Sequence, residues 1–215
     1  MALSKIQPAS MDLTANYAFT GTNSIPSASS GTYEEKKLAT VTASSSGTLS
    51  FTSSIDSTYN IYKFRFIEIH PSHNSNVDFG FQGSTNTGSS YGVTLTSAFF
   101  DAYHYENGSS SAVRNLSSRD LAQSTSFQPL SVNTAEADAD QHVSGELFLF
   151  DPSSTTFVKH FISTTQTASD GGSDDFSDNA YIAGYFNTTS AIDAIQFKFP
   201  SGNIDSGTIE MYGIN

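Results

Sequence analysis

Strict alternation of apolar and polar residues constrains this chain more than any other feature of its sequence. The stretch 195–199 (IQFKF) alternates in this way, and the same period returns over 208–212 (TIEMY). A period of two places the apolar side chains on one face of a β-strand. Pro200 has no amide hydrogen to give to a strand ladder, and 201–207 (SGNIDSG) is rich in turn-forming residues. These features predict a β-hairpin at the C-terminal end.

The same period predicts two more hairpins in the first half of the chain. One joins 38–42 (LATVT) to 48–52 (TLSFT), and the other spans 62–82 with a longer loop. The apolar parity slips at 66–67 (FI), which indicates either a β-bulge or a strand buried on both faces. Farther along, 145–150 (GELFLF) is apolar on both parities and therefore predicts a central strand buried on both sides.

Turn signals recur about every 8–12 residues, which predicts about ten to twelve strands and no helix beyond a single turn near 120–123. The pattern over 109–119 is weak. We therefore expect an all-β protein, an antiparallel β-sandwich of jelly-roll type. We expect an N-terminal arm over residues 1–13 and a single β-sandwich domain over 14–215, in preference to a split near 130–142.

The composition argues against several partners. The 215 residues carry a formal net charge of −12, and the nine Lys and Arg form no cluster, so we expect no nucleic-acid partner. No apolar run approaches the ~20 residues of a membrane span, so no membrane insertion is expected. The first residues lack the apolar core and cleavage site of a secretory signal. The absence of cysteine excludes disulfides and thiolate metal sites.

Two groups of side chains are metal ligands by type but not by spacing. His70 and His73 fall in a predicted turn, where a spacing of three does not direct both rings at one ion. The loop Asp170–Asp178 (DGGSDDFSD) holds four aspartates, whose oxygens suit calcium, but their spacing fits no calcium loop known to us. We expect a solvated acidic loop there, with calcium as the alternative, and we predict no metal and no cofactor.

Sequence motifs for catalysis are missing. The chain contains no GxSxG elbow, no phosphate-binding glycine loop, no dinucleotide fingerprint and no HExxH. Several carboxylates lie near predicted strands, where solvated or hydrogen-bonded acids are the usual case: Asp56, Glu68, Asp101 and Glu146. We therefore predict no catalytic residues and no enzymatic activity, and a depolymerase-like enzyme is the alternative.

Aromatic side chains raise the question of sugar binding, because tyrosine rings can stack on sugars. The chain has ten tyrosines but no tryptophan, the ring that offers the largest apolar face with a polar edge. This favours tyrosines in the core or at its rim over a glycan-binding platform. The tyrosines considered are Tyr59, Tyr62, Tyr91, Tyr103, Tyr105, Tyr181, Tyr185 and Tyr212.

Segments along nearly the whole chain resemble a family of short, tail fibre-like structural proteins of marine tailed bacteriophages. The similar segments are 1–22 (MALSKIQPASMDLTANYAFTGT), 120–123 (DLAQ), 145–163 (GELFLFDPSSTTFVKHFIS) and 187–215 (NTTSAIDAIQFKFPSGNIDSGTIEMYGIN). The most specific part is SGNIDSGTI followed by YGI in the last of these. The resemblance implies a virion component and carries over no catalytic residues.

These observations predict a non-enzymatic structural protein on the surface of a phage particle, either a compact tail appendage or a capsid decoration protein. We expect it to form a homo-oligomer and to bind other virion proteins of the capsid or tail. The alternative is a glycan- or host-receptor-binding module of a tail fibre, whose partner would be a host surface glycan. In either case the Ser/Thr-rich loops, such as 83–90, are the natural contact surfaces.

Overall fold

The computed structural model describes residues 35–73, 75–134, 141–169 and 174–215. All described residues belong to one compact unit, Tyr33–Asn215. The predicted arm over 1–13 and its boundary with the domain lie outside the described residues. Along the described part of the chain, no helix is long and apolar enough to cross a membrane.

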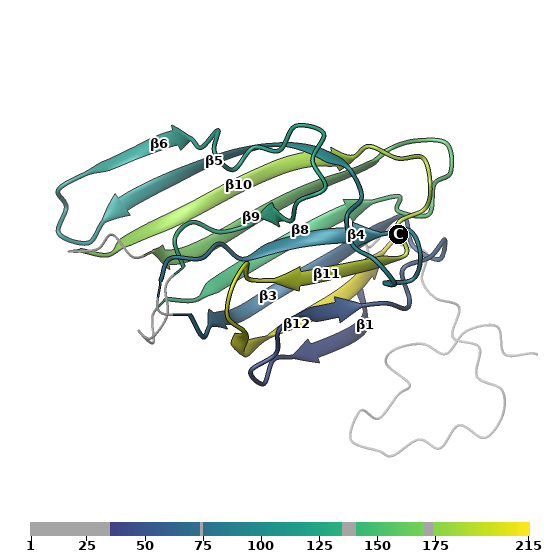
Figure 1. The fold of residues 1–215 in the computed structure, drawn as a ribbon, viewed down its shortest axis with the longest axis horizontal. Coiled ribbons are helices and arrows are strands. Elements are labelled where there is room, and N and C mark those ends of the chain that lie inside the picture. The colour runs from purple at the N-terminus through teal and green to yellow at the C-terminus, as the bar shows by residue number, and fades with distance from the viewer. Residues whose placement is uncertain (1–34, 74, 135–140, 170–173) are drawn as a thin grey trace, which may run out of the picture. The chain divides into compact units, whose positions relative to one another are not determined.

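The described residues form twelve strands and no helix, as the alternation predicted (Figure 1). The strands are β1 (Glu35–Thr42), β2 (Leu49–Phe51), β3 (Ile61–Pro71), β4 (Gly80–Ser84), β5 (Leu95–Tyr105), β6 (Ser111–Asn115), β7 (Gln128–Pro129), β8 (Val143–Phe150), β9 (Lys159–Ser169), β10 (Phe176–Phe186), β11 (Ala194–Lys198) and β12 (Ile204–Ile214).

The strands build two antiparallel sheets, which confirms the predicted β-sandwich. The large sheet has eight strands in the order β1-β12-β3-β8-β9-β10-β5-β6, and the small sheet has four in the order β2-β11-β4-β7. In Figure 1 the small sheet lies across part of one face of the large sheet. The jelly-roll type of connection stays a prediction.

Phenylalanine rings fill the space between the sheets. Phe197 of β11 is at the centre, with its ring centroid 5.2 Å from Phe66 and 5.5 Å from Phe64, both on β3. Its ring is also 5.8 Å from Phe79 and 6.3 Å from Phe81, which belong to its own side of the sandwich. All of these rings are buried, so the alternating phenylalanines supply the core that the pattern predicted.

The three predicted hairpins are wrong in their pairing, although their strands exist. β1, β3 and β12 belong to the large sheet, whereas their expected partners β2, β4 and β11 belong to the small one. Each connection therefore carries the chain across the core from one sheet to the other. The physical reason is that apolar alternation fixes which side of a strand is buried, and two strands facing one core from opposite sheets satisfy it as well as two neighbours do.

Two details of the large sheet test the sequence analysis. The slip at 66–67 is a β-bulge: the β3–β8 register shifts between Phe66 and Ile69, and Glu68 has a φ of 52°. β8 is central, between β3 and β9, as predicted. The prediction that this strand is buried on both sides is wrong, because Phe148 and Phe150 on the outer face are only half-buried.

A long connection, residues 116–134, which includes the two-residue strand β7, covers the inner face of β5 and the adjoining part of β10. Gln128 in this segment receives a hydrogen bond from Ser97 of β5, and Asp120 accepts one of 2.7 Å from the amide of Phe99. Farther along, Ser169 at the end of β9 donates to the carbonyl of Val132. Beneath this cover the sheet can bury polar side chains that the phenylalanine core would exclude.

Candidate functional site

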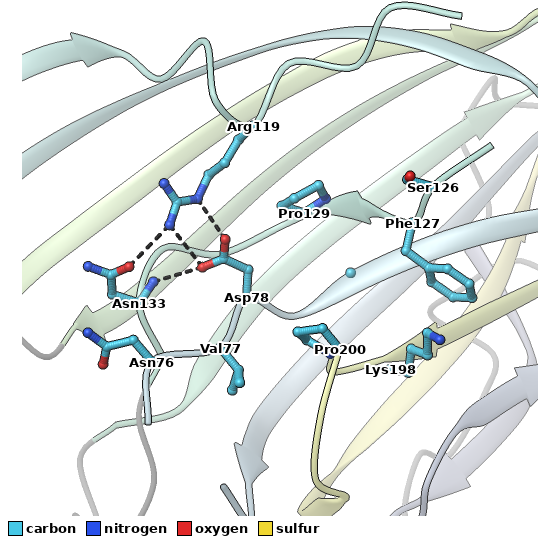
Figure 2. Close-up of a pocket in the computed structure, with 11 residues that line it drawn as sticks. Asn76, Val77, Asp78, Arg119, Ser126, Phe127, Pro129, Asn133, Lys198 and Pro200 are labelled. Carbon is cyan, nitrogen blue, oxygen red and sulfur yellow. Dashed lines mark hydrogen bonds and ion pairs between the residues drawn. The ribbon is translucent and has the colours of Figure 1, made fainter. Parts of the chain in front are cut away.

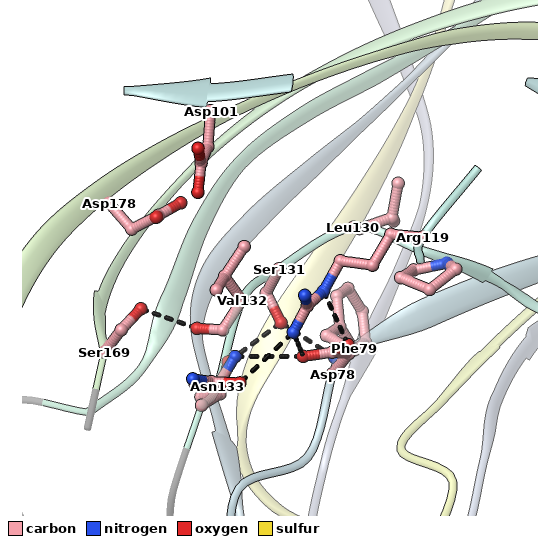
Figure 3. Close-up of polar contacts among 12 residues, drawn as sticks. Asp78, Phe79, Asp101, Arg119, Leu130, Ser131, Val132, Asn133, Ser169 and Asp178 are labelled. Carbon is pink, nitrogen blue, oxygen red and sulfur yellow. Dashed lines mark hydrogen bonds and ion pairs between the residues drawn. The ribbon is translucent and has the colours of Figure 1, made fainter. Parts of the chain in front are cut away.

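A pair of buried carboxyl groups lies under segment 116–134, facing each other from adjacent strands (Figure 3). Asp101 of β5 and Asp178 of β10 are 0% and 1% exposed. Arg114 of β6 reaches both: its Nε donates to Asp101 Oδ1 at 3.0 Å, and its Nη2 donates to Asp101 and, at 3.2 Å, to Asp178 Oδ2. The guanidinium also lies 4.1 Å from the ring centroid of Tyr103. One cation therefore serves two carboxyls.

The two carboxyls differ in their electrostatics. Burial, followed by hydrogen bonding with Asp101 and charge repulsion from it, raises the pKa of Asp178 to about 8, although the cations Arg114 and Arg119 act in the opposite direction. For Asp101 burial acts in the same direction, but hydrogen bonds from Arg114 and Asp178 and the charge of both arginines outweigh it, so its pKa is lowered. At neutral pH Asp178 holds a proton and Asp101 is ionised.

The pair has the chemistry of an acid–base dyad without access to a substrate. Both side chains are covered, and Asp178 Oδ1 is a buried oxygen without a hydrogen-bond partner among the described residues. A protonated Asp178 donates to the ionised Asp101 and so links β10 to β5, and Arg114 links β6 to both strands. The arrangement therefore stabilises this end of the large sheet.

A polar pocket lies beside the small sheet, near the ends of β4, β7 and β11 (Figure 2). One wall of the pocket is a bidentate ion pair between Arg119 and Asp78: Arg119 Nε donates to Asp78 Oδ2 at 2.8 Å, and Nη2 donates to Asp78 Oδ1 at 3.0 Å. Nη2 also donates to Asn133 Oδ1 at 3.1 Å, and the amide of Asn133 donates back to Asp78 at 2.9 Å. This closed network ties Arg119 and Asn133, near the two ends of segment 116–134, to Asp78 just before β4.

The remainder of this pocket combines an aromatic ring with polar side chains. Lys198 at the end of β11 places its Nζ 4.3 Å from the centroid of the Phe127 ring. Asn76 and Ser126 also line the pocket, which has a volume of about 550 Å³. Val77, Pro129 and Pro200 complete the lining, so a small ligand that carries both hydroxyl groups and an apolar face matches the pocket.

A third feature is the outer face of the large sheet, which the small sheet does not cover. It presents an apolar patch, here called the outer patch, made of Phe100, Phe148, Phe150, Ile162, Tyr181 and Tyr185. Phe100 and Ile162 are 47% and 50% exposed. The rings of Phe100 and Tyr181 stack at 5.0 Å with an 8° interplanar angle. A shallow hollow of about 680 Å³ lies over the part of the patch between Phe150, Ile162 and Tyr185.

Charged side chains border the outer patch on the β1–β12–β3 side. Glu210 of β12 pairs with Lys37 at 3.2 Å and with Arg65 at 3.6 Å, and Glu35 pairs with Lys63. A hydrogen bond from Tyr212 and another from Lys37 lower the pKa of Glu210. The outer face therefore carries the apolar patch over one part of β5, β8, β9 and β10 and polar side chains such as Glu146, Gln166 and Asn179 over another part, and it is ionic over β1, β12 and β3.

The described histidines and the described part of the acidic loop do not come together as a metal site. No cluster of three or more His, Asp or Glu side chains with metal-binding geometry occurs in the described ranges. His70 is the penultimate residue of β3 and not part of a turn, whereas His73 follows in the connection. Asp170 lies outside the described residues. Asp178 is not the loop residue that the sequence predicted, because it belongs to β10 and to the buried pair.

The other acids that the sequence singled out lie in separate parts of the fold. Asp56 accepts hydrogen bonds from Thr58, which lower its pKa, and Glu68 sits at the β3 bulge. Glu146 faces Arg65 across the β3–β8 pairing. Of the tyrosines, Tyr62 is buried in the core, whereas Tyr181 lies on the outer patch and is 39% exposed.

Sequence reasoning missed the cations that organise the sites. Arg114 and Arg119 lie in the weak stretch 109–119, which predicted no strand although β6 forms there. Lys159 reads in the sequence only as an alternating residue, yet it is fully buried and donates to the carbonyls of Phe157 and Thr188 at 2.8 and 3.2 Å. The scarcity of Lys and Arg was the available signal, because rare cations in an acidic chain tend to be paired.

No protein-family profile, no curated protein and no solved structure matches this chain. Function is therefore inferred from the geometry and the sequence.

Proposed function

We propose that the chain is a non-enzymatic structural protein of a tailed-bacteriophage particle, displayed on the particle surface as a tail appendage or capsid decoration protein. The resemblance of segments along nearly the whole chain points to this class. The observation that carries the proposal is the outer patch, an apolar surface on a rigid sheet whose side chains are half-exposed.

The outer patch has the properties of a protein contact surface. Its side chains alternate with core residues on β5, β8, β9 and β10, so the sheet holds them in one plane. Contiguous apolar surface rimmed by charge marks protein–protein contact more often than chance exposure does. Aromatic rings at the centre and ion pairs at the rim are the composition of a stable interface. Another virion protein is the partner that this proposal assigns to the patch.

Purified particles test the proposal. Phage particles from the source of the gene are banded on a density gradient, and the chain is quantified against the major capsid protein. We expect a fixed copy number per particle, and the chain's presence in the lysate without any in the banded particles would overturn the proposal.

The role of the outer patch is tested by two matched variants supplied to particles that lack the chain. Ile162→Glu places a charge in the patch, and Phe157→Glu makes the same kind of change at a 70% exposed side chain outside the patch. We expect I162E to fold with a normal melting temperature but to incorporate at least about tenfold less, whereas F157E incorporates normally. Equal incorporation of both variants contradicts the assignment of the patch.

A second candidate function, binding of a host surface glycan, is favoured by the pocket of Figure 2. Its amides, hydroxyl and ammonium offer the hydrogen bonds that sugar hydroxyls or an acidic sugar require. A glycan array followed by calorimetry tests it. Binding that Lys198→Ala and Asn76→Ala reduce, and that Lys37→Ala on the other sheet does not, supports this function. An array without hits removes it.

A further inference from the structure

The edge strand β6 is unprotected, unlike the other edges of the two described sheets. β2 and β7 have three and two residues, which is too short to template another strand. β1 begins with the charged residues Glu35–Lys37 and its register shifts between Lys37 and Ala39. β6 (SAVRN) has five residues, no proline and no bulge. Figure 1 shows β6 at the open end of the large sheet.

The hydrogen-bonding groups of β6 that face away from β5 can be identified from its register. The amide of Leu116 donates to the carbonyl of Phe99, and the amide of Tyr105 donates to the carbonyl of Ser110. In an antiparallel ladder the residues that bond to the neighbour alternate with those that point away. Ala112 and Arg114 therefore bond to β5, whereas 111, 113 and 115 direct their N–H and C=O groups at the open edge.

The side chains of β6 leave this edge free of repulsion. Its single charge, Arg114, turns to the inner face and is held by Asp101 and Asp178. Val113 is on the outer face and is 73% exposed, beside the outer patch residue Phe100 one strand away. The charges that usually block an edge are thus absent from the solvent side of β6.

We propose that β6 pairs with β6 of a second copy of this chain, antiparallel about a two-fold axis at Val113. In this register each outward N–H meets an outward C=O: Val113 faces Val113 of the partner subunit, and Ser111 faces Asn115 of the partner subunit. The small Ala112 lies opposite Arg114 of the partner subunit on the inner face. No like charges oppose each other, and the two large sheets become one continuous sheet.

Self-pairing is favoured over a different partner because the strand is self-complementary. A two-fold axis requires that the same residues serve as both halves of the interface. The polar–Ala–Val–Arg–polar order of β6 meets this condition, with the branched apolar residue on the axis. It also brings the two outer patches side by side, since Phe100 is next to β6 in each copy. The inference is independent of the virion assignment and holds for the purified chain.

Cross-linking tests the register directly, because the chain has no native cysteine. Cα atoms of a hydrogen-bonded antiparallel pair are about 5.5 Å apart, within the range of a disulfide. Val113→Cys is therefore expected to form a covalent dimer under mild oxidation. Ser111→Cys is the matched control, since the same residue in two copies lies about 13 Å apart along the strands in this register. Thr40→Cys on the β1 edge controls for random collision.

Equilibrium sedimentation tests the interface without a cross-link. Val113→Pro removes an outward N–H and spares the bonds to β5, and we expect it to weaken the dimer at least about tenfold. Thr40→Pro removes the equivalent outward N–H on β1 and should leave the dimer intact. A monomeric wild-type chain at high concentration, a dimer unaffected by V113P, or equal oxidation of S111C and V113C would each overturn the proposal.

Discussion

Replacement of Asp178 by asparagine tests whether the buried pair of carboxyl groups holds a proton at neutral pH. In the variant Asp178→Asn, the amide oxygen would keep an acceptor for Arg114 Nη2, and the amide nitrogen would place a donor where the proton of Asp178 now faces Asp101. The substitution therefore imitates the protonated state while removing the titration. Asp101 keeps its own hydrogen bonds to the Arg114 guanidinium.

The size of the effect follows from linkage. Asp178 is protonated in the folded chain up to a pKa of about 8 and ionised in the unfolded chain above its ordinary value of 3.8. Its contribution to stability is thus fully present below about pH 4 and is lost as pH rises toward 8. One proton corresponds to about 1.4 kcal/mol per pH unit, or about 2.5 kcal/mol between pH 5 and 7. The lowered pKa of Asp101 acts only below 3.8, outside this window.

Urea unfolding at pH 5, 6, 7 and 8 measures the effect as the difference in the free energy of unfolding between wild type and Asp178→Asn. Both proteins contain the same histidines, so the contribution of histidine titration cancels in this difference. We expect the free energy of unfolding of D178N, relative to that of the wild type, to increase by about 2.5 kcal/mol from pH 5 to pH 7. Asp205→Asn, an exposed carboxylate change on β12, serves as the control and should follow the wild type. A wild-type–D178N difference that stays constant from pH 5 to 7 refutes the assignment of the proton to Asp178.

Three further outcomes are expected. Arg119→Lys cannot reproduce the fork to Asp78 and should lower the free energy of unfolding by about 1–2 kcal/mol in urea titrations. Lys159→Met removes a buried ammonium whose pKa is lowered by burial, so wild-type stability relative to this variant should rise as pH approaches 10.5, as thermal melts at pH 7 and 10 will show. Gly207 has a φ of 111°, and a Cβ there would lie 2.4 Å from the carbonyl oxygen of Glu68, so Gly207→Ala should lower the free energy of unfolding by several kcal/mol. Gly108 has a φ of 72° but open space around it, so Gly108→Ala should lower the free energy of unfolding by about 1 kcal/mol in the same urea assay.

Strand positions could be predicted from this sequence, but strand partners could not. The stretches 195–199 and 208–212 form strands, and the parity slip at 66–67 is a bulge, because both follow from which side chains are buried. Whether a turn such as 199–203 folds a strand back beside its neighbour or across the core depends on backbone direction at the turn. Apolar periodicity carries no information on that direction, since both paths bury the same side chains.

The polar sites were less predictable for a related reason. Asp101 and Asp178 are 77 positions apart in the numbering. The β5–β10 pairing brings them together, and the β5–β6 pairing places Arg114 opposite Asp101. β6 itself gave a weak pattern because just one of its five residues, Arg114, is even partly buried. An edge strand covered on neither face has no alternation to detect.

The prediction that 145–150 is buried on both sides was wrong for the isolated chain, and the error is informative. β8 has apolar residues on both faces. Those on its outer face continue across the sheet into Ile162, Tyr181 and Phe100 on the neighbouring strands. The small sheet and segment 116–134 cover only the inner face of these strands. An apolar residue held in water lowers solubility and gives the isolated fold little stability, so the proposed cover of the outer face by a partner would account for the apolar residues at these positions. The open β6 edge next to the same patch is a second observation that supports the proposed assembly.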